Sequence, residues 1–233
     1  MLLGVSHVVI ATCIKKSQDL ENLLKVLGYE VDFVETDLIN SKYKDKFLSK
    51  KNKTHDIIFF KCKGRTSIEI VRYENISYAA NNFVISLSDK LEQTDKVISH
   101  TLGFEIFYNA THKFQYIVDI YNILILQTSS IDDEIFFWTK AGFVSKSNVV
   151  SISSPLQSWS ADIYFIEKPG THDVYLDNYG FNTVSIATNK IKECMDYDHL
   201  ISTEIFSIKI NKKKMNIVMI RRKGYNVEIL DIK

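Results

Sequence analysis

Three polar side chains stand in stretches that are otherwise apolar and rich in β-branched residues. They are His7, Glu69 and Glu228. Because side chains alternate between the two faces of a strand, each of them faces away from its most apolar neighbours. Glutamate is disfavoured in strands and costly to bury unless it is paired or bound to a cation. Both glutamates follow a Lys-Gly turn (Lys63-Gly64 and Lys223-Gly224), so we expect them to occupy equivalent places in the fold.

The elements that position these residues are clearest in the first 74 residues, where the pattern predicts the order β-α-β-β-β. Apolar residues recur at helical spacing after the first strand, and Gly28 ends that helix. The predicted strands are Val5–Thr12, Glu30–Glu35, Asp56–Cys62 and Ser67–Tyr73, and the predicted helix is Lys15–Leu27.

The same pattern returns along the chain, which indicates an internal repeat. A shift of 75 residues matches Leu27-Gly28-Tyr29-Glu30-Val31 with Leu102-Gly103-Phe104-Glu105-Ile106. A third copy has strand Ile123–Gln127 and helix Asp132–Lys140. The fourth has strands Thr183–Thr188, Asn216–Ile220 and Asn226–Ile232 with a short helix Lys190–Tyr197. We therefore predict an α+β fold of tandem βαβββ modules over 1–78, 79–121 (partial), 122–178 and 179–233.

The opening Gly4–Thr12, the helix exit Leu27-Gly28-Tyr29 and the strand Ser67-Ile68-Glu69-Ile70 resemble the vicinal oxygen chelate superfamily. That group includes glyoxalase I, methylmalonyl-CoA epimerase, extradiol dioxygenases and bleomycin-resistance proteins. The match is good over 4–74, fair over 178–232 and weak between. It implies paired modules that form curved mixed sheets around a cup-shaped cavity, with modules 1 and 4 as one pair.

The resemblance also implies a metal site. Carried over residue by residue, it gives His7, Glu69 and Glu228 as ligands of a divalent ion such as Zn²⁺, Mn²⁺, Ni²⁺ or Fe²⁺, with Glu228 or Glu69 as the catalytic base. The fourth position is Thr183 or Asn182, and neither is the usual histidine. Copies two and three offer Asn82 and Tyr121 or Asn122 at the histidine place, with no clear acidic match.

These features leave three functions open. The first is a metal-dependent lyase, isomerase or dioxygenase that acts on a small oxygenated molecule. The second is a metal-free small-molecule binding protein of the antibiotic-sequestering type, expected as a homodimer. The third is a structural or partner-binding module whose cup is filled by its own side chains.

Other polar and aromatic residues carry weaker signals. Arg65 and Arg72 flank Glu69 and could bind a carboxylate or phosphate group. An arginine at a strand end more often simply points into solvent. Trp138 and Trp159 could floor a pocket for an aromatic ligand, although core packing is the usual role of such residues.

Composition excludes several classes of function. A net charge of +1 gives no electrostatic case for nucleic-acid binding, and no apolar stretch is long enough to cross a membrane. Three scattered cysteines suit a reducing compartment rather than a disulfide framework. We therefore expect a cytoplasmic protein whose partner is a small molecule, without nucleic-acid or membrane partners.

Overall fold

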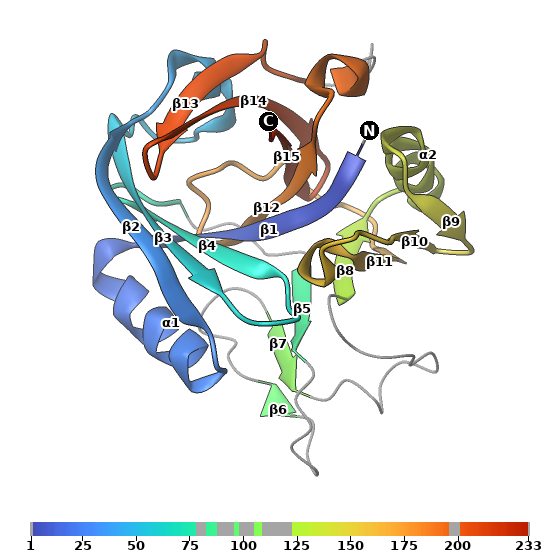
Figure 1. Cartoon of the computed structure of the whole chain (residues 1–233), viewed down its shortest axis with the longest axis horizontal. Helices are drawn as coiled ribbons and strands as arrows, with labels where there is room; N and C mark the ends of the chain where they lie inside the picture. Colours follow the sequence, from blue (N-terminus) through green and yellow to red (C-terminus); the bar gives the residue numbers. More distant parts are fainter. Residues whose placement is uncertain are drawn as a thin grey trace.

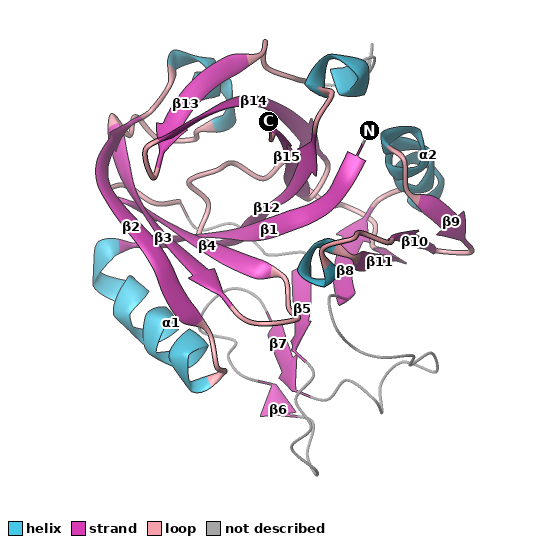
Figure 2. Ribbon diagram, viewed as in Figure 1, coloured by secondary structure: helices cyan, strands magenta, loops and turns pink. Residues whose placement is uncertain are grey.

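Two curved β-sheets dominate the computed structural model of the chain (Figure 1, Figure 2). The structure describes residues 2–77, 83–87, 96–97, 105–108, 123–195 and 201–232. The first sheet contains β1 (Leu2–Cys13), β2 (Glu30–Ile39), β3 (Thr54–Lys61), β4 (Ser67–Tyr73), β12 (Gly180–Thr188), β13 (Phe206–Ile210), β14 (Lys213–Arg222) and β15 (Tyr225–Asp231). Their order across the sheet is β13-β14-β15-β12-β1-β4-β3-β2.

The centre of this sheet joins the two ends of the chain. β1 pairs antiparallel with β12, while β1 lies parallel to β4 and β12 lies parallel to β15. The two halves therefore have the same pairing pattern, and together they wrap around a concave face. The predicted α+β architecture of curved mixed sheets is confirmed; the module boundaries remain predictions.

The second sheet has seven strands in the order β6-β7-β5-β8-β11-β10-β9. Their bounds are β5 (Phe83–Leu87), β6 (Lys96–Val97), β7 (Glu105–Tyr108), β8 (Ile123–Thr128), β9 (Val144–Lys146), β10 (Val149–Ile152) and β11 (Ala161–Glu167). β7 lies parallel to β5, as β4 does to β1. The repeat had instead matched Glu105 with Glu30 of β2, so this equivalence was wrong. A short apolar strand fits either place, because strand preference reflects its packing neighbours more than its own sequence.

Two α-helices accompany the sheets: α1 (Ile14–Val26) and α2 (Ile131–Ala141). α1 buries Leu20 and Leu24, and Gly28 takes the left-handed conformation (φ 84°) that ends it. In the fourth module the structure has a 3-10 turn, η4 (Ile191–Met195), where a helix over Lys190–Tyr197 was predicted; residues 196 and 197 lie outside the described residues. The helices found in the described part of the chain are all too short or too polar to span a membrane.

The main core lies on the convex side of the first sheet. Val8 and Ile10 of β1 point into it and are almost fully buried, whereas the alternate residues of β1 point to the concave side. Burying one such aliphatic side chain stabilises the fold by roughly 1.5–3 kcal/mol. This packing fixes the position of β1 in the sheet, and with it the polar residues on its concave face.

Candidate functional site

The first sheet brings His7, Glu69 and Glu228 together on its concave face. The Nε2 atom of His7 is 3.6 Å from Oε2 of Glu69 and 3.6 Å from Oε2 of Glu228. The three side chains come from β1, β4 and β15, so residues 221 positions apart in sequence form one cluster. All three are shielded from solvent, with side-chain exposures of 6%, 12% and 10%.

Two serines hold this cluster from behind. The Ser6 hydroxyl lies 2.9 Å from Nδ1 of His7 and donates to the Ser185 carbonyl. Because that hydroxyl has one proton to give, this pattern assigns the ring proton to Nδ1 and leaves a lone pair on Nε2. The Ser185 hydroxyl donates to Oε2 of Glu228 at 2.7 Å. Nε2 of His7 is buried and has no hydrogen-bond partner.

Burial decides the protonation of the cluster. It lowers the pKa of His7 to about 4, although the Glu228 carboxylate acts to raise it. Burial also raises the pKa of Glu69 to about 8; the Glu228 carboxylate adds to this rise and the Lys44 ammonium opposes it. Without a cation, His7 is therefore neutral and Glu69 keeps its proton at neutral pH.

The strand register identifies the place that matches His7 in the second half of the sheet. Glu69 pairs across β1–β4 with the residue two places after His7. Glu228 pairs across β12–β15 with Ser185, which is two places after Thr183. Thr183, rather than its neighbour in sequence, is thus the counterpart of His7.

The side chain of Thr183 does not complete a fourth ligand position. Its hydroxyl donates to Oδ1 of Asn182 at 2.9 Å, and both residues are fully buried. The two residues named as alternatives for that position therefore bond to each other. Asn82, Tyr121 and Asn122, the candidates in the second and third modules, lie outside the described residues.

A cavity of about 220 Å³ opens onto the cluster. Its wall is largely aromatic and aliphatic, with Phe33 and Phe59 stacked at a ring separation of 5.1 Å. Phe59 also meets the His7 ring edge-on at 5.1 Å. Trp159 is part of the wall, as one sequence hypothesis proposed. A cavity of this size suits a small molecule with an apolar part and a polar end.

The other residues weighed from sequence have structural partners. Arg72 forms an ion pair with Asp56 at 3.0 Å, and Arg65 donates to the Leu27 carbonyl at 3.0 Å, so neither arginine faces the cavity as a clamp. Trp138 is buried and donates from Nε1 to the Tyr225 hydroxyl at 2.9 Å. It belongs to the core and not to the cavity.

One imidazole and two carboxyl groups are the types of ligand that bind a divalent ion such as Zn²⁺. Atoms about 2.0–2.2 Å from a tetrahedral Zn²⁺ are about 3.3–3.6 Å apart, which matches the two distances from His7 Nε2. The unpartnered Nε2 lone pair also points to a missing partner. In the part of the chain that the structure describes, however, no three His, Cys, Asp or Glu side chains already form a complete metal-binding group. Because Glu69 keeps its proton in the absence of a cation, binding of an ion at neutral pH requires Glu69 to release that proton.

Comparison with solved structures identifies the fold. The chain has the vicinal oxygen chelate fold, which confirms the resemblance seen in the sequence at the level of architecture. A single-residue variant of glyoxalase I from Zea mays aligns with a TM-score of 0.58 at 11% identity, over 98% of this chain and 92% of that one. A proposed dioxygenase from Bacillus subtilis aligns with a TM-score of 0.57 at 12% identity, over 98% and 85%. No family model and no curated protein matches the sequence.

Proposed function

We propose that the chain is a divalent-metal-dependent enzyme of the lyase, isomerase or dioxygenase class that acts on a small oxygenated molecule. One observation carries the proposal: the unpartnered, buried Nε2 of His7 lies 3.6 Å from a carboxylate oxygen of both Glu69 and Glu228. A buried imidazole lone pair beside two carboxylates is a costly arrangement unless a cation satisfies it.

When bound, the ion would act as a Lewis acid on adjacent oxygens of the substrate. The protein's own residues supply the rest. His7 is oriented by Ser6, and Glu228 by Ser185. Either Glu69 or Glu228 would act as the base that accepts or gives a proton during the reaction. The apolar wall around Phe59 keeps water from the reacting atoms.

Metal content tests the proposal directly. Tag-free protein is analysed for Zn, Mn, Ni and Fe and then titrated with each ion by calorimetry. We expect about one ion per chain in the wild type and at least a hundredfold weaker binding in the Glu69→Gln/Glu228→Gln variant, because Gln keeps the shape and loses the charge. Glu167→Gln, an exposed carboxylate on β11, is the matched control and should bind like the wild type.

Circular dichroism of each variant checks that it folds. A loaded wild type is then assayed for isomerisation of a hemithioacetal and for cleavage of a catechol ring. Uptake of metal that is equal in the wild type and the double variant contradicts the assignment of these ligands. Absence of uptake by the wild type contradicts the metal-dependent function as a whole.

A metal-free binding protein is the second candidate, and Thr183 is the observation that favours it. The position matching His7 has no imidazole, and the Thr183 hydroxyl is already bonded to Asn182. In that case the cavity would bind its ligand through Glu69 as a neutral carboxylic acid and through the aromatic wall. The same titration separates the two candidates, since this one takes up no ion.

A further inference from the structure

The cavity wall contains positive charges that the cluster does not use. Three lysines line it: Lys44, Lys61 and Lys213. Lys61 is neutralised by Asp32, whose Oδ2 lies 2.7 Å from its Nζ. For Lys44 and Lys213, no ion pair or side-chain hydrogen bond is found within the described ranges of the chain. Two cationic groups thus stand unpaired around a largely apolar cavity.

Lys44 belongs to the 3-10 turn η1 (Lys42–Phe47) and is half-buried. Its side chain lines the same cavity as Glu69 of the cluster and Phe59 of β3, so its ammonium lies within electrostatic reach of a molecule bound there.

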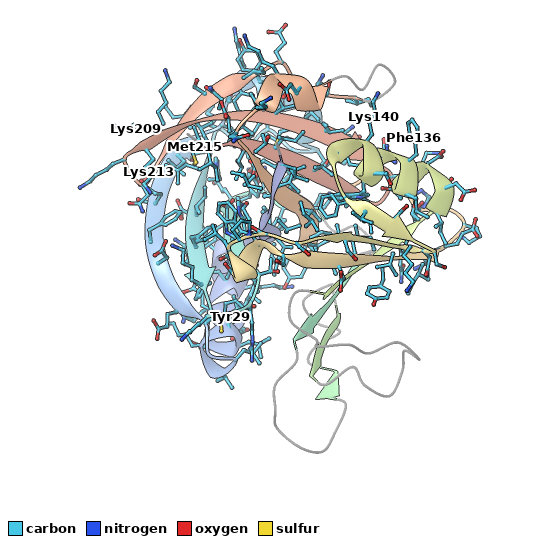
Figure 3. The ribbon with its side chains drawn as sticks, turned by 45° about the vertical axis from the view of Figure 1, so that its right-hand side comes forward. Tyr29, Phe136, Lys140, Lys209, Lys213 and Met215 are labelled. Carbon is cyan, nitrogen blue, oxygen red and sulfur yellow. The ribbon has the colours of Figure 1, made fainter. Side chains whose placement is uncertain are left out.

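Lys213 is held at the other side of the mouth by a tight turn. Asn211 and Lys212 both have positive φ (47° and 62°), which is the geometry of a two-residue hairpin turn between β13 and β14. The backbone N–H of Asn211 donates to Oε1 of Glu35 on β2 at 2.9 Å. The hairpin tip is thereby tied to the opposite edge of the sheet, and Lys213 lies at that tip (Figure 3).

The net charge of the side chains that line the cavity depends on Lys44 and Lys213. A divalent ion, when bound, would offset the two carboxylates of Glu69 and Glu228, and Asp32 offsets Lys61. Among the charged side chains that line the cavity, Lys44 and Lys213 are then left as an excess of positive charge; the Glu35 carboxylate that holds the hairpin tip does not line it. An excess of positive charge between low-dielectric walls attracts anions.

We propose that the cavity selects small organic acids, with Lys44 and Lys213 binding an anionic group that lies apart from the adjacent oxygens of the molecule. That the adjacent oxygens of the acid bind at His7, Glu69 and Glu228 rests on the proposed function. The binding of the anionic group rests on Lys44 and Lys213, which line the cavity whether or not an ion is bound. Neutral molecules of the same shape would bind through the apolar wall but without this charge contribution.

Two probes with the same oxygens separate the charge from the shape: 3,4-dihydroxybenzoate and catechol. Calorimetry on the full chain, loaded with Zn²⁺ and metal-free, should show the acid binding roughly tenfold or more tightly than catechol. In the Lys44→Met/Lys213→Met variant we expect this preference to disappear while the affinity for catechol is unchanged. Added salt should weaken only the acid.

Lys209→Met is the matched control. Lys209 is exposed on β13 between Ile208 and Ile210, whose side chains line the cavity, so it points outward (Figure 3). Its loss should leave the preference intact. Equal binding of the two probes by the wild type, or a preference that survives in the double lysine variant, overturns the inference.

The outcome is independent of the proposed function. Metal uptake without a preference for the acid overturns this inference alone. A preference for the acid in a protein that takes up no metal supports it and overturns the metal-dependent reaction instead. Unchanged catechol affinity and an unchanged circular dichroism spectrum show that the lysine variant is folded.

Discussion

Glu69 keeps its proton to unusually high pH in the folded chain. Burial, with the Glu228 carboxylate, raises its pKa from the ordinary 4.5 to about 8. Between these values the folded chain holds a proton that the unfolded chain has released, so metal-free stability falls as pH rises through this window. His7 has the opposite effect on the pH dependence of stability, because its pKa is lowered from 6.5 to about 4. Its contribution to the free energy of unfolding rises with pH between these values and is constant above pH 6.5.

The window from pH 6.5 to 8 therefore isolates Glu69. We expect the free energy of unfolding of the metal-free protein, measured with urea, to fall over this range by an amount that corresponds to loss of up to roughly one bound proton. Glu69→Gln cannot ionise and should flatten the profile, whereas Glu167→Gln should keep the wild-type slope. Parallel profiles for the wild type and Glu69→Gln would show that this carboxyl ionises normally in the fold.

At the residue scale the sequence is informative where polarity conflicts with a strand. His7, Glu69 and Glu228 could be singled out because each interrupts an apolar stretch, and the fold brings the three together. That they hold a metal stays a prediction. Ser6 and Lys44 could not be singled out: a serine in a strand and a lysine in a polar stretch are ordinary, and only the fold shows what they face.

At the scale of elements, β1 is positioned by a close contact with the turn η3 (Gln157–Trp159), which also supplies Trp159 to the cavity wall. Gly4 lies at this contact with φ +140°. A Cβ there would stand 2.3 Å from the Trp159 carbonyl oxygen. Only glycine allows both the backbone conformation and the approach.

Gly4→Ala should therefore destabilise the protein by more than about 3 kcal/mol, because strain and a clash with backbone add together. Gly28→Ala is the comparison: its φ is also positive, but nothing lies within 4 Å of the added Cβ. We expect a cost of about 1–2 kcal/mol there. Thermal unfolding gives the two values, and near-UV circular dichroism should change only in Gly4→Ala. Similar costs at both glycines would mean that η3 moves aside freely.

Strands were predictable where a glycine turn and an alternating apolar pattern occurred together. β4 and β15 follow glycine turns and carry period-2 patterns, so both were found within one or two residues. β9 and β10 were not predicted, because strands of three and four residues with exposed or mixed side chains carry no clear period. β13 alternates too but was not predicted, because polar flanks and a following run of lysines are typical of a loop; Lys213 and Lys214 in fact begin β14.

At the scale of the molecule, α2 links the two sheets. It follows β8 of the second sheet, yet on its inner face Trp138 contacts Tyr225 of β15 and Glu134 contacts Arg222 of β14, both in the first sheet. Phe136, by contrast, is exposed on the outer side (Figure 3). The first sheet with its cavity is built wholly from one chain, so a homodimer, which remains a prediction, is not needed to complete the cup.

Tyr225 is the centre of this link, and its hydroxyl is buried. It donates to the Glu134 carboxylate, accepts from Nε1 of Trp138 at 2.9 Å, and lies beside the Arg222–Glu134 ion pair of 2.9 Å. Tyr225→Phe removes both hydrogen bonds and leaves Trp138 Nε1 and part of the Glu134 carboxylate unsatisfied in the core. Such groups cost about 1–3 kcal/mol each.

We expect Tyr225→Phe to lower the free energy of unfolding by about 2–4 kcal/mol, in a single transition, because the two sheets share one core. Tyr164→Phe, at a half-buried site on β11, should cost less than about 0.5 kcal/mol. Urea unfolding followed by fluorescence and by far-UV circular dichroism measures both. Two separate transitions in the wild type, or an unchanged stability in Tyr225→Phe, would mean that the sheets fold independently and that α2 adds contact without coupling them.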